Sequence, residues 1–301
     1  MILCCGEALI DMLPVPGGGA FAPHPGGAVF NTAVALGRLG ATTGFFSGLS
    51  ADFLGDLLRE RLDEARVDTS LCVTAKRPCT LAFVRLVDGQ ASYAFYDEGT
   101  AGRMLSAADL PQTPVQALFF GGISLVAEPC GSAYEALMLR EAGRRVTMID
   151  PNIRPGFVTD EGAYRARLAR MLARADIVKL SSEDLDWLAP GQGEGFARGL
   201  IEGGTSLVLL TDGGKGATAI TRDLRLTQPA RRVTVVDTVG AGDTFNAGIL
   251  ASFQKDGVLT RQGLAALDTE TLTRALTLAS DAAAVTVSRA GANPPWPSEL
   301  P

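Results

Sequence analysis

Histidine is almost absent from this 301-residue sequence, which contains only His24. A single imidazole excludes a metal centre built from several histidines, and it leaves a Ser-His-Asp triad with one available base. Cysteine is also scarce: the five residues are odd in number and form no Cys-x-x-Cys pair, so they predict reduced, buried thiols. Most common hydrolase designs are weakened by these two shortages.

Positive charge is in short supply as well, because 27 Lys and Arg face 33 Asp and Glu, a net charge of -6. A surplus of acid repels phosphate backbones and anionic lipids, so neither nucleic acid nor a membrane surface is expected as a partner. Long hydrophobic runs are missing, and the N-terminus carries no basic leader segment. We therefore predict a cytoplasmic protein.

Glycine and apolar residues, in contrast, are plentiful. The sequence has 35 glycines, 47% hydrophobic residues and 20% charged residues, a profile typical of a globular enzyme. Its length allows either one large domain or a large domain with a small one. We predict a single domain over residues 1–301 with a small insertion.

Short apolar runs rich in β-formers alternate with stretches of helical periodicity. This alternation predicts a mostly parallel α/β sheet with helices on both faces, and glycine turns at one sheet edge where ligands bind. The strand-like runs are residues 1–5, 43–47, 117–120, 145–149, 177–180, 207–210 and 232–236. Helical periodicity is found at residues 30–39, 53–65, 134–142 and 163–173.

One region breaks the alternation. Cys79–Leu86 and Ala91–Tyr96 are two β-type runs joined by Val87–Gln90, a pattern that indicates a hairpin without an intervening helix. The segment Met12–Pro25, with three glycines in its middle, is expected to add strands to the same small sheet. We predict a lid formed by about residues 12–25 and 75–102.

The most informative motif is the run Asp237-Thr-Val-Gly240-Ala-Gly242-Asp243-Thr-Phe, which follows a strand-like segment and begins a helix. The backbone amides of Gly240, Ala241 and Gly242, with the positive end of the helix dipole, would make a site for the charge of a transferring phosphoryl group. Asp243 could accept the proton of a substrate hydroxyl there. The alternative is that Asp243 only caps the helix.

This run resembles the C-terminal signature of the ribokinase-like (PfkB) carbohydrate kinases, and residues 25–41 are similar to the family's N-terminal signature. The resemblance covers the chain from Gly6 to about Gly291. It implies a three-layer α/β/α sandwich with a mostly parallel sheet, a small β-sheet lid and a homodimer formed through that lid. It also implies transfer of the ATP γ-phosphate to a primary hydroxyl of a small sugar, with Asp243 as catalytic base.

The sugar side of the site is implied by three motifs. Gly26 and Gly27 would let backbone approach a polyol closely, and Asn31 offers both a donor and an acceptor. A tight turn before a helix is the plainer interpretation of the glycine pair. Asp11 matches the family's sugar-binding aspartate. Further candidates, for which simple packing or a surface salt bridge is the alternative, are Phe95, Tyr96 and Arg154.

The nucleotide side is implied by a second strand that runs into a glycine turn, residues 209–216. The P-loop pattern and a Rossmann glycine fingerprint after the first strand are both missing, so these nucleotide-binding classes lose support. The resemblance implies contacts with ATP from Lys179, Ser181, Thr211, Gly213, Gly216 and Ser280.

Magnesium is the metal that the resemblance implies, bridging the nucleotide phosphates and keeping several waters. Residues 181–184 depart from the family's usual Asn-x-x-Glu, so either Glu183 or Asp184 is the candidate that serves the metal through water. Asp237 matches a residue that helps to hold a monovalent cation in many relatives. Activation by potassium is left open.

The motifs look most like those of fructokinases, which makes fructose the first expected substrate. 2-Keto-3-deoxygluconate is the second, because Arg154 could bind its carboxylate, and ribose and nucleosides follow. Two other classes stay as alternatives: a catalytically silent regulator that binds sugar or nucleotide, and a nicotinamide-dependent oxidoreductase. The second is disfavoured because the first turn, residues 6–11, carries carboxylates where a pyrophosphate should bind.

Overall fold

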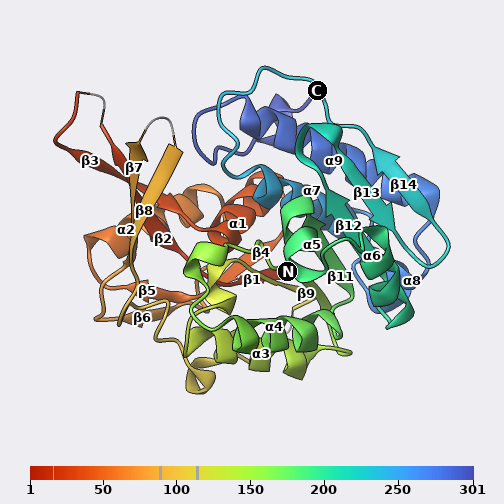
Figure 1. Ribbon diagram of the computed structural model, residues 1–301, viewed down its shortest axis with the longest axis horizontal. Helices are drawn as coiled ribbons and strands as arrows, with labels where there is room; N and C mark the ends of the chain where they lie inside the picture. Colours follow the sequence, from red (N-terminus) through yellow and green to blue (C-terminus); the bar gives the residue numbers. More distant parts are fainter. Residues whose placement is uncertain (16, 88–89, 113–114) are drawn as a thin grey trace.

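The main sheet crosses the middle of the molecule (Figure 1). In the computed structural model, which describes residues 1–15, 17–87, 90–112 and 115–301, this sheet has eight strands in the order β14-β13-β12-β11-β10-β9-β1-β4. The strands from β4 to β12 are parallel, and β13 and β14 extend the sheet antiparallel. Their bounds are β1 Ile2–Cys5, β4 Thr43–Phe46, β9 Ala117–Gly121, β10 Val146–Asp150, β11 Ile177–Ser181, β12 Leu207–Thr211, β13 Ala217–Ile220 and β14 Arg225–Gln228.

Helices cover both faces of this sheet because its central strands are apolar on both sides, as parallel strands usually are. In β1, Cys4 packs into one core and Leu3 into the other. Figure 1 shows α1 and α7 on one side of β1 and β9, and α3 and α4 on the other. The three-layer sandwich is confirmed. The helices are α1 Ala28–Arg38, α2 Phe53–Glu64, α3 Cys130–Glu141, α4 Glu161–Leu172, α5 Ser182–Leu188, α6 Glu194–Glu202, α7 Ala241–Lys255, α8 Arg261–Ala265 and α9 Thr269–Val287.

A second, four-stranded sheet stands apart from the main one, and we call it the small sheet. Its order is β3-β2-β7-β8, with β2 and β7 parallel and the two outer pairs antiparallel. The expected small sheet is therefore present; residues 88–89 of the predicted hairpin link, and residue 16 of the first segment, lie outside the described residues. The strands are β2 Leu9–Pro14, β3 Phe21–Gly26, β7 Thr80–Val87 and β8 Gln90–Tyr96.

Two segments differ from the predicted strands. Residues 232–236 form no strand; Val235 and Val236 are exposed, and the amide of Val236 donates to the carbonyl of Val287. Within the described residues no strand pairs with this segment, so its β-propensity is not realised. Near the expected lid, β6 (Val73–Ala75) pairs with β5 (Gly48–Ser50) in a separate two-stranded sheet.

The parallel topology places the functional motifs together. The carboxyl ends of β1, β10, β11 and β12 lie at one edge of the main sheet, and α7 packs against both α1 and α9 beside this edge. Open α/β sheets bind ligands at that edge. Among the residues that the structure describes, none of the helices is both long and apolar enough to span a bilayer.

Candidate active site

Asp243 lies in the first turn of α7, directly after a sharp glycine turn. Gly240 precedes the helix with a φ of 79°, and a β-carbon there would come within 2.8 Å of the Ala292 side chain. Glycine is the residue that adopts this left-handed conformation at little cost. The turn delivers the Asp243 carboxylate to a site where it is only 7% exposed.

Asn31 of α1 donates a hydrogen bond from Nδ2 to Oδ2 of Asp243 over 2.9 Å. This bond joins the two sequence motifs, which are 212 positions apart in the chain. Burial raises the pKa of Asp243 to about 7, with the Asn31 bond and Lys179 acting against the rise and Asp150 and Glu7 adding to it. A carboxyl group with a pKa near neutral pH is well matched to accepting a proton from a hydroxyl.

The backbone amides at the start of α7 have few partners. The amide of Ala241 donates to the carbonyl of Thr238 over 3.3 Å, and no side chain caps the helix. Within the described residues, no acceptor is found for the amides of Gly240, Gly242 or Asp243. Free amides at the positive end of a helix attract anions, so the turn is suited to phosphate, with Ala241 contributing less than its two neighbours.

The Gly26–Gly27 pair makes room for two of the protein's own acidic residues. A β-carbon at Gly26 would lie 2.4 Å from Oδ2 of Asp11, and one at Gly27 would lie 3.0 Å from the carbonyl oxygen of Glu7. Asp11 stands in β2, and burial raises its pKa to about 6. The close approach expected here between backbone and sugar is therefore, in the structure, first an approach between backbone and these two acids.

Glu7 is a functional candidate that the sequence motifs did not single out. Its buried carboxylate accepts from the amide of Ala28, at the start of α1, over 2.9 Å, and from the amide of Ser124 over 3.2 Å. Burial raises the pKa of Glu7, although the hydrogen bonds from Ser124 act against the rise. Glu7 thus fixes the first turn of the helix that carries Asn31. The signal was available, since Glu7 lies two residues after a fully buried strand.

The two lid aromatics point to opposite faces of β8, as neighbouring strand residues must. Phe95 is paired through Ala82 with Asp11, so it shares the face of Asp11, and its ring packs against Phe157 at 4.7 Å. Tyr96 lies on the other face, against Phe83, and is 61% exposed. This corrects the expectation that both rings contact the same sugar.

The predicted nucleotide residues meet at the edge formed by β11 and β12. Ser181 and Thr211 are register partners at the ends of these strands, and the glycine turn after β12 contains Gly213 and Gly216. Gly216 also lets the turn pass close to the Gln228 carbonyl, where a β-carbon would come within 2.1 Å. Ser280, partly buried in α9, makes no hydrogen bond through its side chain to any described residue.

The sequence model of the pfkB family carbohydrate kinases matches residues 1–299. The chain belongs to this family. It is 55% identical to a fructokinase of Rhizobium leguminosarum bv. trifolii over 90% of this chain and 85% of that one. It is similar to the ATP-bound structure of a Xylella fastidiosa fructokinase, with a TM-score of 0.90 and 32% identity over 97% and 93% of the two chains. It is also similar to the structure of a Vibrio cholerae O395 fructokinase double mutant with bound fructose, ADP and potassium ion. The TM-score is 0.85 and the identity 25%, over 97% of this chain and 93% of that one.

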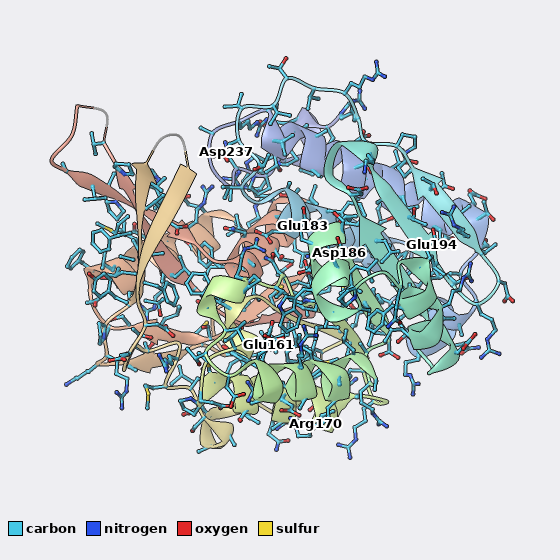
Figure 2. All side chains as sticks on the ribbon, in the orientation of Figure 1. Glu161, Arg170, Glu183, Asp186, Glu194 and Asp237 are labelled. Carbon is cyan, nitrogen blue, oxygen red and sulfur yellow. The ribbon has the colours of Figure 1, made fainter. Side chains whose placement is uncertain are left out.

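The two acidic candidates for magnesium differ in this kinase. Asp184 is buried and uses both oxygens: Oδ2 accepts from the amide and hydroxyl of Ser181, and Oδ1 accepts from the amide of Ile153 over 2.6 Å. Glu183, at the exposed start of α5, leaves its carboxylate toward solvent. Figure 2 labels Glu183 together with Asp237, whose oxygens accept from the amides of Val239 and Gly291.

Arg154 is exposed beside the short helical turn Pro155–Phe157, and its guanidinium donates to the carbonyl of Ile153 over 3.0 Å. In the described part of the chain, no carboxylate forms a salt bridge with it, so the plainer interpretation of this arginine as half of a surface ion pair has no support. Its charge remains available to a ligand.

Lys179 was expected at the nucleotide, and the kinase structure buries it instead in a polar cluster. Its Nζ donates to Oδ2 of Asp150 over 3.0 Å, and the same oxygen accepts from Nδ2 of Asn246 over 2.7 Å. Neither Asp150 nor Asn246 had been assigned a role. Each directly follows a segment already singled out, Asp150 after residues 145–149 and Asn246 after residues 237–245, but a contact between residues 96 positions apart leaves no local signal.

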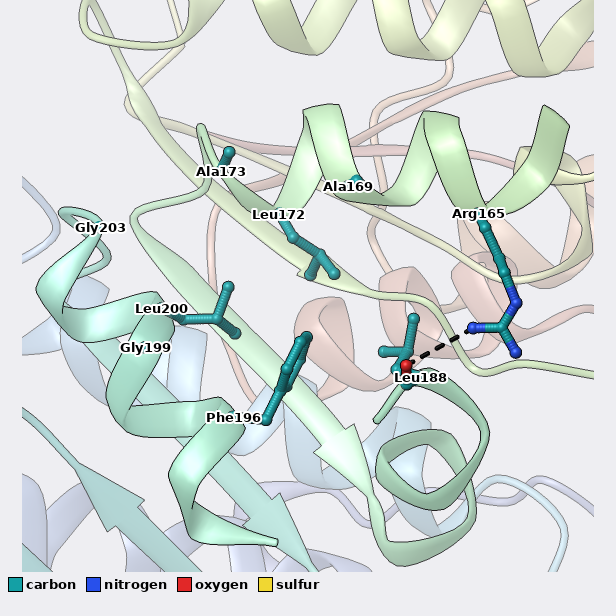
Figure 3. Close-up of a pocket in the computed structure, with 9 residues that line it drawn as sticks. All are labelled: Arg165, Ala169, Leu172, Ala173, Leu188, Phe196, Gly199, Leu200 and Gly203. Atoms are coloured by element: carbon teal, nitrogen blue, oxygen red, sulfur yellow. Dashed lines mark hydrogen bonds between the residues drawn. The ribbon is translucent and has the colours of Figure 1, made fainter. Parts of the chain in front are cut away.

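A cavity of about 420 Å³ between α4 and α6 lies away from these residues (Figure 3). Leu172, Phe196 and Leu200 give it an apolar wall, and Arg165 crosses its rim to reach the carbonyl of Leu188. Its lining includes none of the catalytic or binding candidates. This cavity is therefore separate from the candidate site at the sheet edge.

Proposed function

We propose that this carbohydrate kinase transfers the γ-phosphate of ATP to the 6-hydroxyl of fructose, giving fructose 6-phosphate and ADP. The observation that carries the proposal is the 2.9 Å hydrogen bond from Asn31 to Asp243, which brings a sugar-binding motif and a base together beside an anion-binding turn. The fructokinase relatives support fructose as the acceptor and ATP as the donor.

In the proposed mechanism, Asp243 accepts the proton of the attacking hydroxyl while Asn31 orients its carboxylate. The free amides of Gly242 and Asp243, at the positive end of α7, stabilise negative charge on the phosphoryl group in transit. Asp11 and Phe95, on one face of the small sheet, hold the sugar so that the hydroxyl is in line with the phosphate.

The carboxylates near the candidate site fit a magnesium ion that is held by few protein ligands. Among the described residues no group of three or more acidic, histidine or cysteine side chains converges, and Mg²⁺ in kinases commonly keeps its waters and uses few carboxylates. Glu183, with its exposed carboxylate, would hold the ion through water. When bound, magnesium neutralises phosphate charge. We further propose a monovalent cation beside Asp237, as the potassium-bound relative suggests.

2-Keto-3-deoxygluconate is the second candidate substrate, because Arg154 is exposed, has no salt bridge to a described residue and could bind a carboxylate. Ribose and nucleosides follow. A catalytically silent regulator is disfavoured, since such a protein would be expected to lose Asp243 or the glycine before it, and this chain retains both.

The deciding experiment measures ADP release with ATP and magnesium on fructose, 2-keto-3-deoxygluconate, ribose and adenosine. We expect the highest kcat/KM on fructose, loss of activity with EDTA, and faster turnover in potassium than in sodium. Arg154→Gln is the matched variant: it should leave fructose unaffected and weaken only an acidic substrate. Silence on all four acceptors would favour the regulator.

The outer face of the small sheet supports a homodimer. Phe21, Phe83 and Tyr96 stack edge to face across three strands, with Phe21 44% and Tyr96 61% exposed. Exposed aromatic patches commonly mark protein interfaces. Sedimentation at micromolar concentration should give a dimer, and Tyr96→Ser with Phe21→Ser should give a monomer; a monomeric parent protein would contradict the proposal.

The cysteines support the cytoplasmic location that we propose. All five are free thiols, and four are buried. Burial raises the pKa of Cys79 to about 11 and that of Cys130 to about 12, so both stay protonated and unreactive at neutral pH. Such thiols suit a reducing compartment in which ATP is made and used.

A further inference from the structure

A buried polar cluster lies beneath the catalytic turn. Asp150 ends β10, Lys179 lies in β11 and Asn246 lies in α7, and their exposures are 2%, 3% and 0%. One carboxylate oxygen of Asp150 accepts from both Lys179 and Asn246. The other oxygen accepts from the amide of Asn152 over 3.2 Å, so neither oxygen of Asp150 is left to carry a proton, and the cluster holds a buried ion pair rather than two neutral groups.

The cluster reaches the active site through α7. Asn246 follows Asp243 by one helical turn, so its hydrogen bond to Asp150 anchors the segment that carries the base. The ammonium of Lys179 lies against the phosphate turn, because a β-carbon at Gly242 would be 3.3 Å from its Nζ. A buried lysine that makes one hydrogen bond within the described residues has donors left over for its surroundings.

The charges that face Asp243 come from four directions. Lys179 of β11 is the cation, Asp150 of β10 and Glu7 after β1 are anions, and Asn31 of α1 is a neutral donor. Burial opposes the charge of Lys179, but the carboxylates of Asp150 and Asp184 outweigh burial and raise its pKa, so it remains an ammonium at neutral pH. Around Asp243, two groups thus favour the carboxylate against its acidic neighbours: Asn31 through its hydrogen bond and Lys179 as the cation.

We propose that Lys179, held by Asp150 and Asn246, is a positioning residue for phosphoryl transfer that keeps Asp243 ionised and fixes the first turn of α7. The proposal rests on the role of Asp243 as the base. It assigns to Lys179 a task at the base and not only at the nucleotide. A strand residue 64 positions before Asp243 would then set the pH range in which the kinase works.

Charge-changing variants of Lys179 and Asp150 test the proposed role of Lys179 through the pH dependence of kcat/KM. The wild type should lose activity below about pH 7, as Asp243 becomes protonated. Lys179→Gln keeps an amide donor but removes the cation. The acidic limb of the pH profile, where kcat/KM falls with decreasing pH, should therefore move up by about one pH unit. Asp150→Asn removes an anion, so the limb should move down. The double variant should return toward the wild-type position.

Asn246→Ala is the neutral control, because it removes the anchor without changing charge; it should lower kcat and leave the limb in place. If all the variants lose activity while the acidic limbs of their pH profiles coincide with that of the wild type, the cluster is only structural and the proposal is overturned. Thermal melts report folding, and if Lys179→Gln does not fold, an unmoved limb in Asp150→Asn overturns the proposal by itself. Failure of the proposed function is distinguishable, since the wild type itself would then release no ADP.

Discussion

Two helices of this kinase begin in almost the same way and end up with different tasks. Both α1 and α7 follow a glycine with positive φ, Gly27 at 111° and Gly240 at 79°, and neither has a capping side chain at that glycine. At α1, however, the first amide is occupied by the carboxylate of Glu7. At α7, no acceptor among the described residues meets the amides of Gly242 and Asp243.

The difference teaches what a glycine turn before a helix means. Its amides attract an anion in either case. When the protein supplies the anion, as Glu7 does, the turn is structural and fixes the position of the helix. When it supplies none, the turn can take the anion from a substrate. The glycines therefore do not mark a phosphate site by themselves; the occupancy of the neighbouring amides decides.

The two buried acids differ in the same sense. Glu7 accepts from two backbone amides, whereas Asp243 accepts from one side-chain amide and has a pKa of about 7. The hydrogen bonds to Glu7 thus offset part of the cost of its burial, whereas Asp243 is held in a costly state that suits a base. Substitutions at the two sites should consequently have opposite effects on stability and unequal effects on catalysis.

The largest expected effect is the loss of kcat in the variant Asp243→Asn. This substitution keeps an oxygen for the bond from Asn31 but cannot take up a proton, so kcat should fall by about 10²–10⁴, the usual contribution of a general base. Calorimetric titration should find sugar and nucleotide binding nearly unchanged. Turnover above about one per cent of the wild type would contradict the base assignment at that scale.

The same substitution should make the protein more stable. The pKa of Asp243 is about 7 in the folded protein, against an ordinary value of 3.8, so ionisation of this residue destabilises the fold. The free energy of unfolding should therefore fall as pH rises from about 4 to 7. One pKa unit corresponds to about 1.4 kcal/mol. The free energy of unfolding of Asp243→Asn should therefore exceed that of the wild type by up to about 4 kcal/mol at pH 8 and by little at pH 4. Urea unfolding at both pH values measures this, and an equal gain at both would contradict it.

Sequence patterns predicted the layers, the parallel sheet and the small sheet, because hydrophobic periodicity acts locally. They also single out Asp243 and its turn as candidates, since all of the proposed chemistry lies within nine residues. Strand period would have separated Phe95 from Tyr96, had it been applied at β8. Residues 232–236 show the opposite case, in which local β-propensity is overruled by the lack of a partner strand.

The contacts that complete the site were not predictable in this way. The bond between Asn31 and Asp243, and the cluster of Asp150, Lys179 and Asn246, join residues that are distant in the sequence. One lysine in an apolar strand gives no sign of its partner, because many lysines reach solvent from such positions. Only the topology, which brings β10, β11 and α7 together, pairs it with a buried acid.

The smallest of the three effects is expected for Glu7→Gln, and it tests the structural side of the comparison. The two oxygens of Glu7 each accept from a different amide, whereas glutamine has one oxygen and presents an NH₂ to the second donor. Leaving a buried donor unpaired costs about 1–3 kcal/mol, so the variant should unfold at lower urea than the wild type. Because α1 carries Asn31, the KM for the sugar should rise more than kcat falls. Stability unchanged or increased, as expected for Asp243→Asn, would show that the α1 turn does not depend on its carboxylate and that the two helix starts are alike after all.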